Sequence, residues 1–110
     1  MLRRWSRWGL VGAEVLDGAG VRLGRVVDTY PFDGGSEVEL IVVRLPRFGG
    51  RRMVPVDDLV SEGFAVRTPY LRWQVEDSPE LSGGRHAIED PERAKSYWRF
   101  EEPARPLALA

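Results

Sequence analysis

The stretch Glu37–Leu45, which reads EVELIVVRL, decides the fold because its centre is rich in β-branched residues. Such a run predicts a β-strand. A strand with one wet face alternates apolar and polar side chains, whereas Leu40–Val43 is apolar on both faces. Something must therefore cover its outer face. The sequence leaves open whether the cover is the C-terminal segment or a second subunit.

Turn residues on both sides of this stretch predict further strands. Asp17-Gly18 is a strong hairpin signal, and Gly49-Gly50 closes another hairpin. The connections are too short for crossover helices, which predicts antiparallel pairing throughout. We therefore expect a mainly β fold, a small antiparallel β-barrel or tightly rolled sheet of five to six strands. The predicted strands are residues 10–16, 21–30, 37–45, 51–56 and 63–67, with a short further piece at 58–61. The predicted core includes Val11, Val15, Leu23, Val26, Leu40, Val42, Val54, Val56, Phe64 and Val66.

The pattern changes near residue 68, where helix signals begin. Thr68-Pro69 reads as an N-cap followed by proline and predicts a short helix over 69–76. A strand over the same residues is the alternative prediction, because apolar and polar side chains also alternate there. Asp90-Pro91 repeats the start signal and predicts a helix from Pro91 to about Arg99. The expected organisation is a basic arm at 1–9, the barrel at 10–68, a helical extension at 69–100 and a flexible tail at 101–110.

Composition restricts the class of protein. The chain has 110 residues, of which 43% are hydrophobic and 30% charged, as expected for one soluble globular domain. Its 16 basic and 17 acidic residues give no overall field for wholesale nucleic-acid binding. The absence of cysteine excludes disulfides and thiolate metal sites, and it fits a cytoplasmic protein. No run approaches the ~20 apolar residues that span a bilayer.

Motifs that resemble catalytic or ligand sites have simpler explanations. The glycines of Gly18–Gly24 precede a predicted strand, so they fit a turn better than a phosphate loop, which needs a helix. The single histidine, His86, lies in a polar, glycine-rich loop and is expected to be exposed. Asp57 and Asp58 fit a turn or cap better than a cation site. Asp28 fits a carboxylate bonded to backbone amides or an arginine. We therefore expect no enzyme activity, no cofactor, no metal and no small-molecule substrate.

A cluster of arginines in one predicted hairpin is the first candidate binding site. Arginine beside an exposed aromatic ring can bind RNA, phosphate head groups or an acidic protein face. The alternative is a solvated hairpin whose arginines form salt bridges with Glu37 and Glu39. The members of this candidate site are Arg44, Arg47, Phe48, Arg51 and Arg52.

The N-terminal arm is a second candidate. Its tryptophans and arginines are typical of a basic anchor at a membrane interface. The alternative is an arm that packs one tryptophan against the domain. The residues concerned are Arg3, Arg4, Trp5, Arg7 and Trp8.

Self-association is the third expectation. A two-fold dimer would cover the doubly apolar strand and use the aromatic C-terminal helix. The alternative is that this helix folds back on its own barrel and gives a monomer. The expected interface residues are Ile41, Val43, Tyr97, Trp98 and Phe100.

Several segments resemble the PRC-barrel family in their order and spacing. Leu10–Val15, a glycine-bearing turn and Leu23–Asp28 resemble the opening of that domain, and Met53–Leu59 resembles its later valine-proline, acidic and leucine segment. The resemblance covers about residues 10–68. Ser78-Pro79 and Tyr97-Trp98 are similar to the tail of free-standing bacterial members.

The resemblance implies a small antiparallel barrel with no catalytic residues to carry over. The family includes the cytoplasmic domain of the photosynthetic reaction-centre H subunit and the C-terminal domain of a ribosome maturation factor. It therefore implies a non-enzymatic adaptor that binds a protein partner. The alternatives are an RNA- or ribosome-associated factor that uses the arginine hairpin 44–52, and a peripheral component of a membrane complex.

Overall fold

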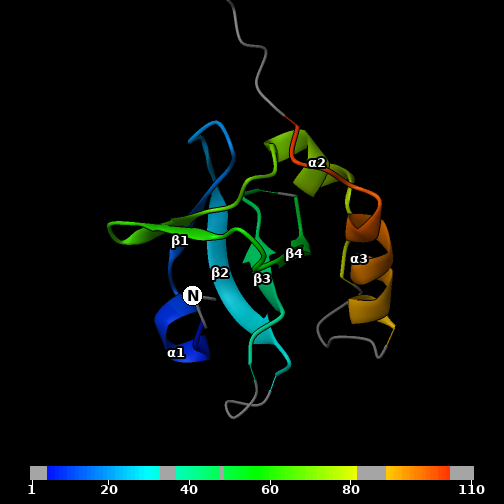
Figure 1. The fold of residues 1–110 in the computed structure, drawn as a ribbon, viewed down its shortest axis with the longest axis horizontal. Helices are drawn as coiled ribbons and strands as arrows, with labels where there is room; N and C mark the ends of the chain where they lie inside the picture. The colour runs from blue at the N-terminus through cyan, green and yellow to red at the C-terminus, as the bar shows by residue number, and fades with distance from the viewer. Residues whose placement is uncertain (1–4, 33–36, 48, 82–88, 105–110) are drawn as a thin grey trace, which may run out of the picture.

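The computed structural model describes residues 5–32, 37–47, 49–81 and 89–104. Within these residues the fold is mainly β, with three helices around one mixed sheet of six strands (Figure 1). The strands are β1 (Glu14–Leu16), β2 (Arg22–Tyr30), β3 (Leu40–Arg44), β4 (Arg51–Pro55), β5 (Val60–Glu62) and β6 (Ala65–Arg67). The helices are α1 (Arg7–Leu10), α2 (Arg72–Asp77) and α3 (Asp90–Arg99).

The sheet has the strand order β4-β3-β2-β1-β6-β5. Neighbouring strands are antiparallel except β1 and β6, which are parallel. The expectation of antiparallel pairing throughout is therefore wrong at this pair. Four strands separate β1 from β6 along the chain, which is enough length for the chain to return in the same direction without a crossover helix. β4 and β5 form the two ends of this order and do not pair with each other.

β3 is buried on both faces within a single chain. Leu40, Ile41, Val42 and Val43 are 3%, 0%, 0% and 0% exposed. Both α2 and α3 pack against β4, the neighbour of β3, and the Trp98 Nε1–H donates a 2.7 Å hydrogen bond to the carbonyl of Met53. Figure 1 shows α3 beside this part of the sheet. Of the two covers that the sequence left open, the C-terminal segment is the one observed.

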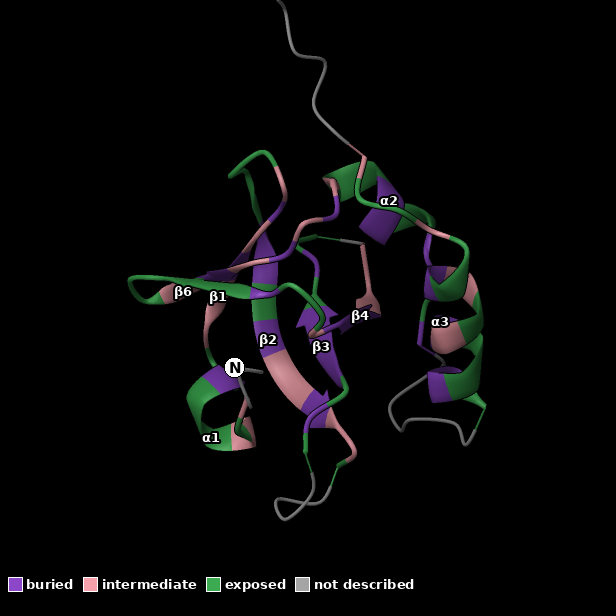
Figure 2. Ribbon diagram, viewed as in Figure 1, coloured by how far each residue is buried: buried purple, intermediate pink, exposed green. Residues whose placement is uncertain are grey.

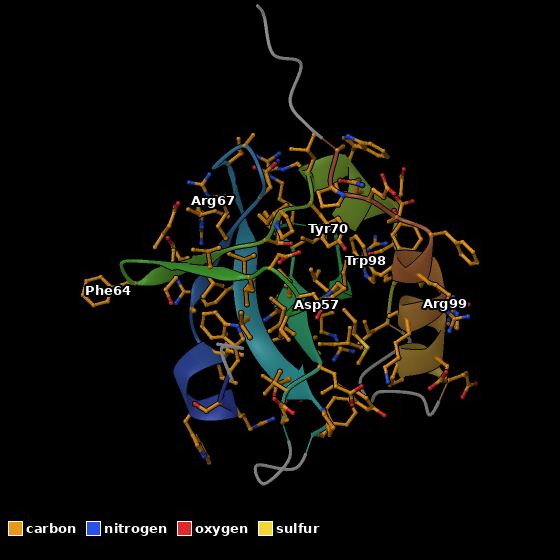
Figure 3. All side chains as sticks on the ribbon, in the orientation of Figure 1. Asp57, Phe64, Arg67, Tyr70, Trp98 and Arg99 are labelled. Carbon is orange, nitrogen blue, oxygen red and sulfur yellow. The ribbon has the colours of Figure 1, made fainter. Side chains whose placement is uncertain are left out.

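Most of the predicted core is confirmed, and Figure 2 shows the buried residues gathered along β2, β3 and β4. Val11 and Phe64, however, are 40% and 101% exposed, so their assignment to the core is wrong. Val11 is the C-cap residue of α1 and belongs to no strand. Phe64 follows Gly63, whose φ is +63°, in the two-residue loop that joins β5 to β6. It therefore stands at the hairpin tip (Figure 3). The residues confirmed as buried are Val15, Leu23, Val26, Leu40, Val42, Val54 and Val66, while Val56 is partly buried.

The first half of the strand predicted at 10–16 is a helix end and a turn instead. Ser6 caps α1, its Oγ accepting a 3.3 Å hydrogen bond from the Gly9 N–H. Gly12, with φ of +95°, turns the chain before β1 begins. Arg7 of α1 pairs with the Asp28 carboxylate on β2. Within the described part of the predicted N-terminal arm, Arg7 thus ties α1 to the sheet and Trp5 packs against the core.

The two C-terminal helices confirm the helical predictions, with one corrected start. α2 begins three residues after Pro69, so Thr68-Pro69 is not its cap. The N–H of Arg72 instead donates a 3.1 Å hydrogen bond to Oδ2 of Asp17, a residue 55 positions away. A cap from so far along the chain cannot be read from local sequence. α3 begins at its predicted Asp-Pro signal and buries Pro91, Ala94 and Trp98 on one face.

Candidate binding surfaces at the two ends of the β3–β4 hairpin

Three arginines lie side by side across the sheet at the turn end of β3 and β4. The register places Arg25 opposite Arg44 and Arg44 opposite Arg51. Directly opposed residues of antiparallel strands present their side chains on the same face, and neighbouring strands are ~4.8 Å apart. We call these three residues the arginine row. Like charges placed directly opposite each other destabilise a sheet, so this row favours an anion beside it.

The three guanidinium groups of the row differ in how many ion pairs and hydrogen bonds they form within the chain. Arg25 lies 4.0 Å from the Glu14 carboxylate and donates a 3.3 Å hydrogen bond to the Gly12 carbonyl. Arg51 is half-buried and also interacts within the chain. Arg44, in the middle, is exposed and forms no ion pair or hydrogen bond with any other residue that the structure describes. Arg44 is therefore the strongest candidate in the row for contact with an external anion.

The other predicted members of the arginine hairpin have different positions. Arg47 is exposed in the turn beyond Arg44, with φ of +60°. Arg52 is used internally, because its guanidinium donates to the carbonyls of Gly49 and Ser78. Phe48 lies outside the residues that the structure describes. Sequence reasoning missed Arg25, since only strand pairing brings it beside Arg44.

Acidic residues gather at the opposite end of the same hairpin. Glu37 and Glu39 precede β3, whereas Asp57 and Asp58 follow β4. At ~3.3 Å per residue, the five residues of β3 separate the two ends by roughly 13 Å. The expected salt bridge from the hairpin arginines to Glu39 is therefore not the one that forms, while the one to Glu37 stays a prediction. Glu39 pairs instead with Lys95 of α3, at 2.9 Å from Oε1 to Nζ.

These acidic residues line a cleft of about 890 Å³ between α3 and the open end of the β3–β4 hairpin. We call it the acidic cleft. Among the residues that the structure describes, its charged lining comprises four carboxylates and two cations, so carboxylates outnumber cations there. Apolar side chains, among them Leu40, Leu59 and Trp98, provide the rest of its wall. The charged residues are Glu37, Glu39, Asp57, Asp58, Lys95 and Arg99.

The field of these carboxylates reaches the aromatic residues beside the cleft. Tyr70 and Trp98 are in ring contact, with centroids 4.3 Å apart, and Figure 3 shows Trp98 extending from α3 towards Tyr70. Burial raises the pKa of Tyr70, and the nearby charges of Asp57, Asp58 and Glu101 raise it further. Asp58 has φ of +60° in a turn, which confirms the turn interpretation of this aspartate pair. The cleft thus combines an apolar wall with exposed negative charge.

The residues predicted for a two-fold interface are mostly interior. Ile41 and Val43 are both 0% exposed, and Trp98 is 5% exposed. Tyr97 is half-buried and donates a 2.6 Å hydrogen bond to the Gln74 carbonyl. Phe100 alone of the five is strongly exposed, at 83%. Ile41 and Val43 therefore offer no surface to a second subunit, while the oligomeric state itself stays a prediction.

The N-terminal residues do not form one exposed basic face. Trp5 packs against the core, and Arg7 is held by Asp28 and Thr29. Trp8 is 81% exposed, whereas residues 1–4 lie outside the described part of the chain. Among the described residues, no helix is long and apolar enough to span a membrane.

The candidate catalytic groups have structural roles where the structure describes them. Asp28 accepts hydrogen bonds from Arg7 and from the Thr29 N–H, the latter at 2.8 Å, as the structural interpretation predicted. The Gly18–Gly24 segment leads into β2 and not into a helix. His86 lies outside the described ranges. Within those ranges, no group of three or more histidine, cysteine or acidic residues could hold a metal ion.

Comparison with known proteins adds no assignment to these surfaces. No protein-family model matches the chain, and no curated protein matches it significantly.

Proposed function

We propose that the protein is a non-enzymatic adaptor of the PRC-barrel type whose arginine row binds an acidic surface of a protein partner. The observation that carries this proposal is the position of Arg44, which is exposed between two other arginines. Guanidinium groups pair with carboxylates in a bidentate geometry that gives specificity as well as energy. A partner carboxylate beside Arg44 would relieve the repulsion within the row.

The flanks of the row favour a short acidic patch over a long polyanion. The row is two strand spacings wide, or ~10 Å. Glu14 lies opposite Arg25 on β1, and the Glu80 carboxylate lies against Gly50 at the other edge. An extended RNA strand would meet these acids on either side, in a chain whose formal net charge is −1. A protein surface with two or three carboxylates fits the row without that repulsion.

The fold is consistent with this proposal. The PRC-barrel resemblance implies a small antiparallel β-barrel, and the observed domain agrees with it in being mainly β with a six-stranded sheet, while β1 and β6 are parallel. We further propose that the sheet closes into a barrel, that the protein is a member of the PRC-barrel family and that it is located in the cytoplasm. Each exposed ion pair is worth only ~0.2–1 kcal/mol, so we expect weak, reversible binding that weakens as salt rises.

The test is fluorescence anisotropy of a labelled oligoglutamate peptide, with a labelled single-stranded RNA as the competing ligand. We expect the peptide to bind at low salt and Arg44→Glu to abolish binding, because the substitution places a carboxylate in the middle of the row. Arg93→Glu, the same charge change on α3 away from the row, is the matched control and should bind as the parent does. Tighter binding of RNA than of the peptide would support the RNA-associated alternative and overturn the proposal. Peptide binding that survives Arg44→Glu would also overturn it.

A further inference from the structure

The two ends of the β3–β4 hairpin carry opposite charge, and this polarity suggests a partner. Arg44 and Arg51 lie at the turn end, while Glu39 and Asp57 lie at the open end. Both ends belong to the same two strands, so the opposite charges point in opposite directions along one strand axis. A surface of this kind is complementary to itself when a second copy is shifted along that axis.

We infer that the partner of the arginine row is the acidic cleft of a second copy of this chain, which produces a head-to-tail assembly. This inference rests on the proposed function, because it names the acidic surface that the arginine row binds. The contact is heterologous: each copy offers one arginine row and one acidic cleft. Such contacts continue into open chains unless the rotation between copies closes a ring.

The shape and charge of the cleft suit this occupant. A cleft of about 890 Å³ admits several arginine side chains at once, and the apolar wall near Trp98 can pack against their aliphatic stems. Asp57 and Asp58 are exposed, and neither forms an ion pair with another residue that the structure describes. Glu39, by contrast, is already paired with Lys95. We therefore expect Asp57 and Asp58 to receive Arg44, the middle residue of the arginine row, together with Arg47 from the adjoining turn of the neighbouring copy.

The buried core is not needed for this contact. Arg44 and Arg47 are exposed in a single chain, as are Asp57 and Asp58. The association therefore requires no opening of the fold, unlike an interface built from Ile41 and Val43. It is mainly electrostatic, so it should form at low salt and weaken at least ~10-fold between about 20 mM and 500 mM salt.

Two variants each neutralise the charge at one end of the β3–β4 hairpin. Arg44→Gln with Arg47→Asn removes charge from the arginine end, and Asp57→Asn with Asp58→Asn removes it from the acidic end. Asparagine suits positions 47 and 58 because both have φ of +60°, where asparagine is tolerated better than most residues. Sedimentation velocity at low salt should show the parent chain forming dimers and larger species. Each variant alone should be a monomer.

Mixing the two variants provides the decisive measurement. One contributes an intact cleft and the other an intact row, so an equimolar mixture should form dimers but no larger species. Glu76→Gln with Glu92→Gln is the matched control. It removes two exposed acids outside the cleft, gives the same net charge as the acidic-end variant and should assemble like the parent. Arg99→Glu adds an acid to the cleft lining and should strengthen assembly, an effect that general loss of stability would not produce.

Several outcomes would overturn the inference. They are a monomeric parent at low salt, a salt-insensitive dimer that both variants retain, or a mixture that stays monomeric. Failure of this inference is separable from failure of the proposed function, because the oligoglutamate titration uses the arginine row alone. A parent that binds the peptide without assembling keeps the proposed function and refutes the second copy as its partner.

Discussion

Replacement of Trp98 tests whether α3 stabilises its own chain or a neighbouring subunit. The indole is 5% exposed, contacts the rings of Tyr70 and Tyr97, and donates a hydrogen bond to the Met53 carbonyl. Trp98→Ala removes this packing, which typically costs ~3–5 kcal/mol, and leaves a buried carbonyl without its donor, at a further ~1–3 kcal/mol. The sum approaches the ~5–15 kcal/mol that stabilises an ordinary domain, so we expect Trp98→Ala to unfold the chain.

Trp98→Phe is therefore the quantitative probe. It keeps an aromatic ring in the site and removes the indole N–H, with an expected loss of ~1–3 kcal/mol. Urea titration followed by far-ultraviolet circular dichroism measures the loss, and light scattering measures the mass. Phe100→Ala, at a residue 83% exposed beside the same helix end, is the control and should change stability by less than ~0.5 kcal/mol. An unchanged free energy of unfolding for Trp98→Phe together with a lower mass would show that Trp98 packs against a neighbouring subunit. Its placement in the core of its own chain would then be wrong.

Three further predictions follow from burial and ionisation. Val42→Ala, at a position 0% exposed in the centre of β3, should lower the free energy of unfolding by ~1–3 kcal/mol in urea titration; a loss of a few tenths would contradict the placement of this strand. Phe64→Ser, at the exposed hairpin tip, should leave stability within ~0.5 kcal/mol of the parent, whereas a loss of more than ~2 kcal/mol would return Phe64 to the core. Burial first, then the nearby charges of Glu101 and Asp77, raise the pKa of Tyr97 to about 12 from its ordinary value of 10.0. The unfolded chain therefore releases the Tyr97 proton at lower pH than the folded chain, so the free energy of unfolding should fall as pH rises between about 10 and 12. This fall should be less steep in Tyr97→Phe. Equal slopes in the parent and the variant would exclude Tyr97 as the cause.

The charge pattern of the β3–β4 hairpin is the feature of the fold on which both proposals rest. Its strands are short and apolar, so the charged residues are confined to the two ends of the hairpin. The turn end carries the arginine row and the open end borders the acidic cleft. Both proposals use this separation of charge, and neither depends on the fold becoming flexible or opening.

Local sequence was sufficient for the elements whose stability is decided locally. The β-branched centre of β3, the Asp17-Gly18 turn and the Asp90-Pro91 helix start each predict their element, because the relevant backbone preferences act within a few residues. Burial on both faces of β3 was likewise readable from its lack of alternation. Local signals also misled: Phe64 is apolar like its neighbours, but the two-residue turn beside Gly63 places it in solvent.

The candidate sites depended on contacts between distant parts of the chain, which local patterns do not encode. Several arginines near residue 50 are visible in the sequence. Only the tertiary structure shows that Arg52 donates a hydrogen bond to the Ser78 carbonyl whereas Arg44 is exposed. Strand register adds Arg25 to the row. The parallel pairing of β1 with β6 and the cap that Asp17 provides to α2 arise in the same way. In each case the sequence determines which groups are present, whereas packing determines which of them meet. Composition and local order therefore specified a mainly β domain with a C-terminal helix, and only the tertiary structure divided its charges between two opposite ends, because that division is set by pairing across the sheet.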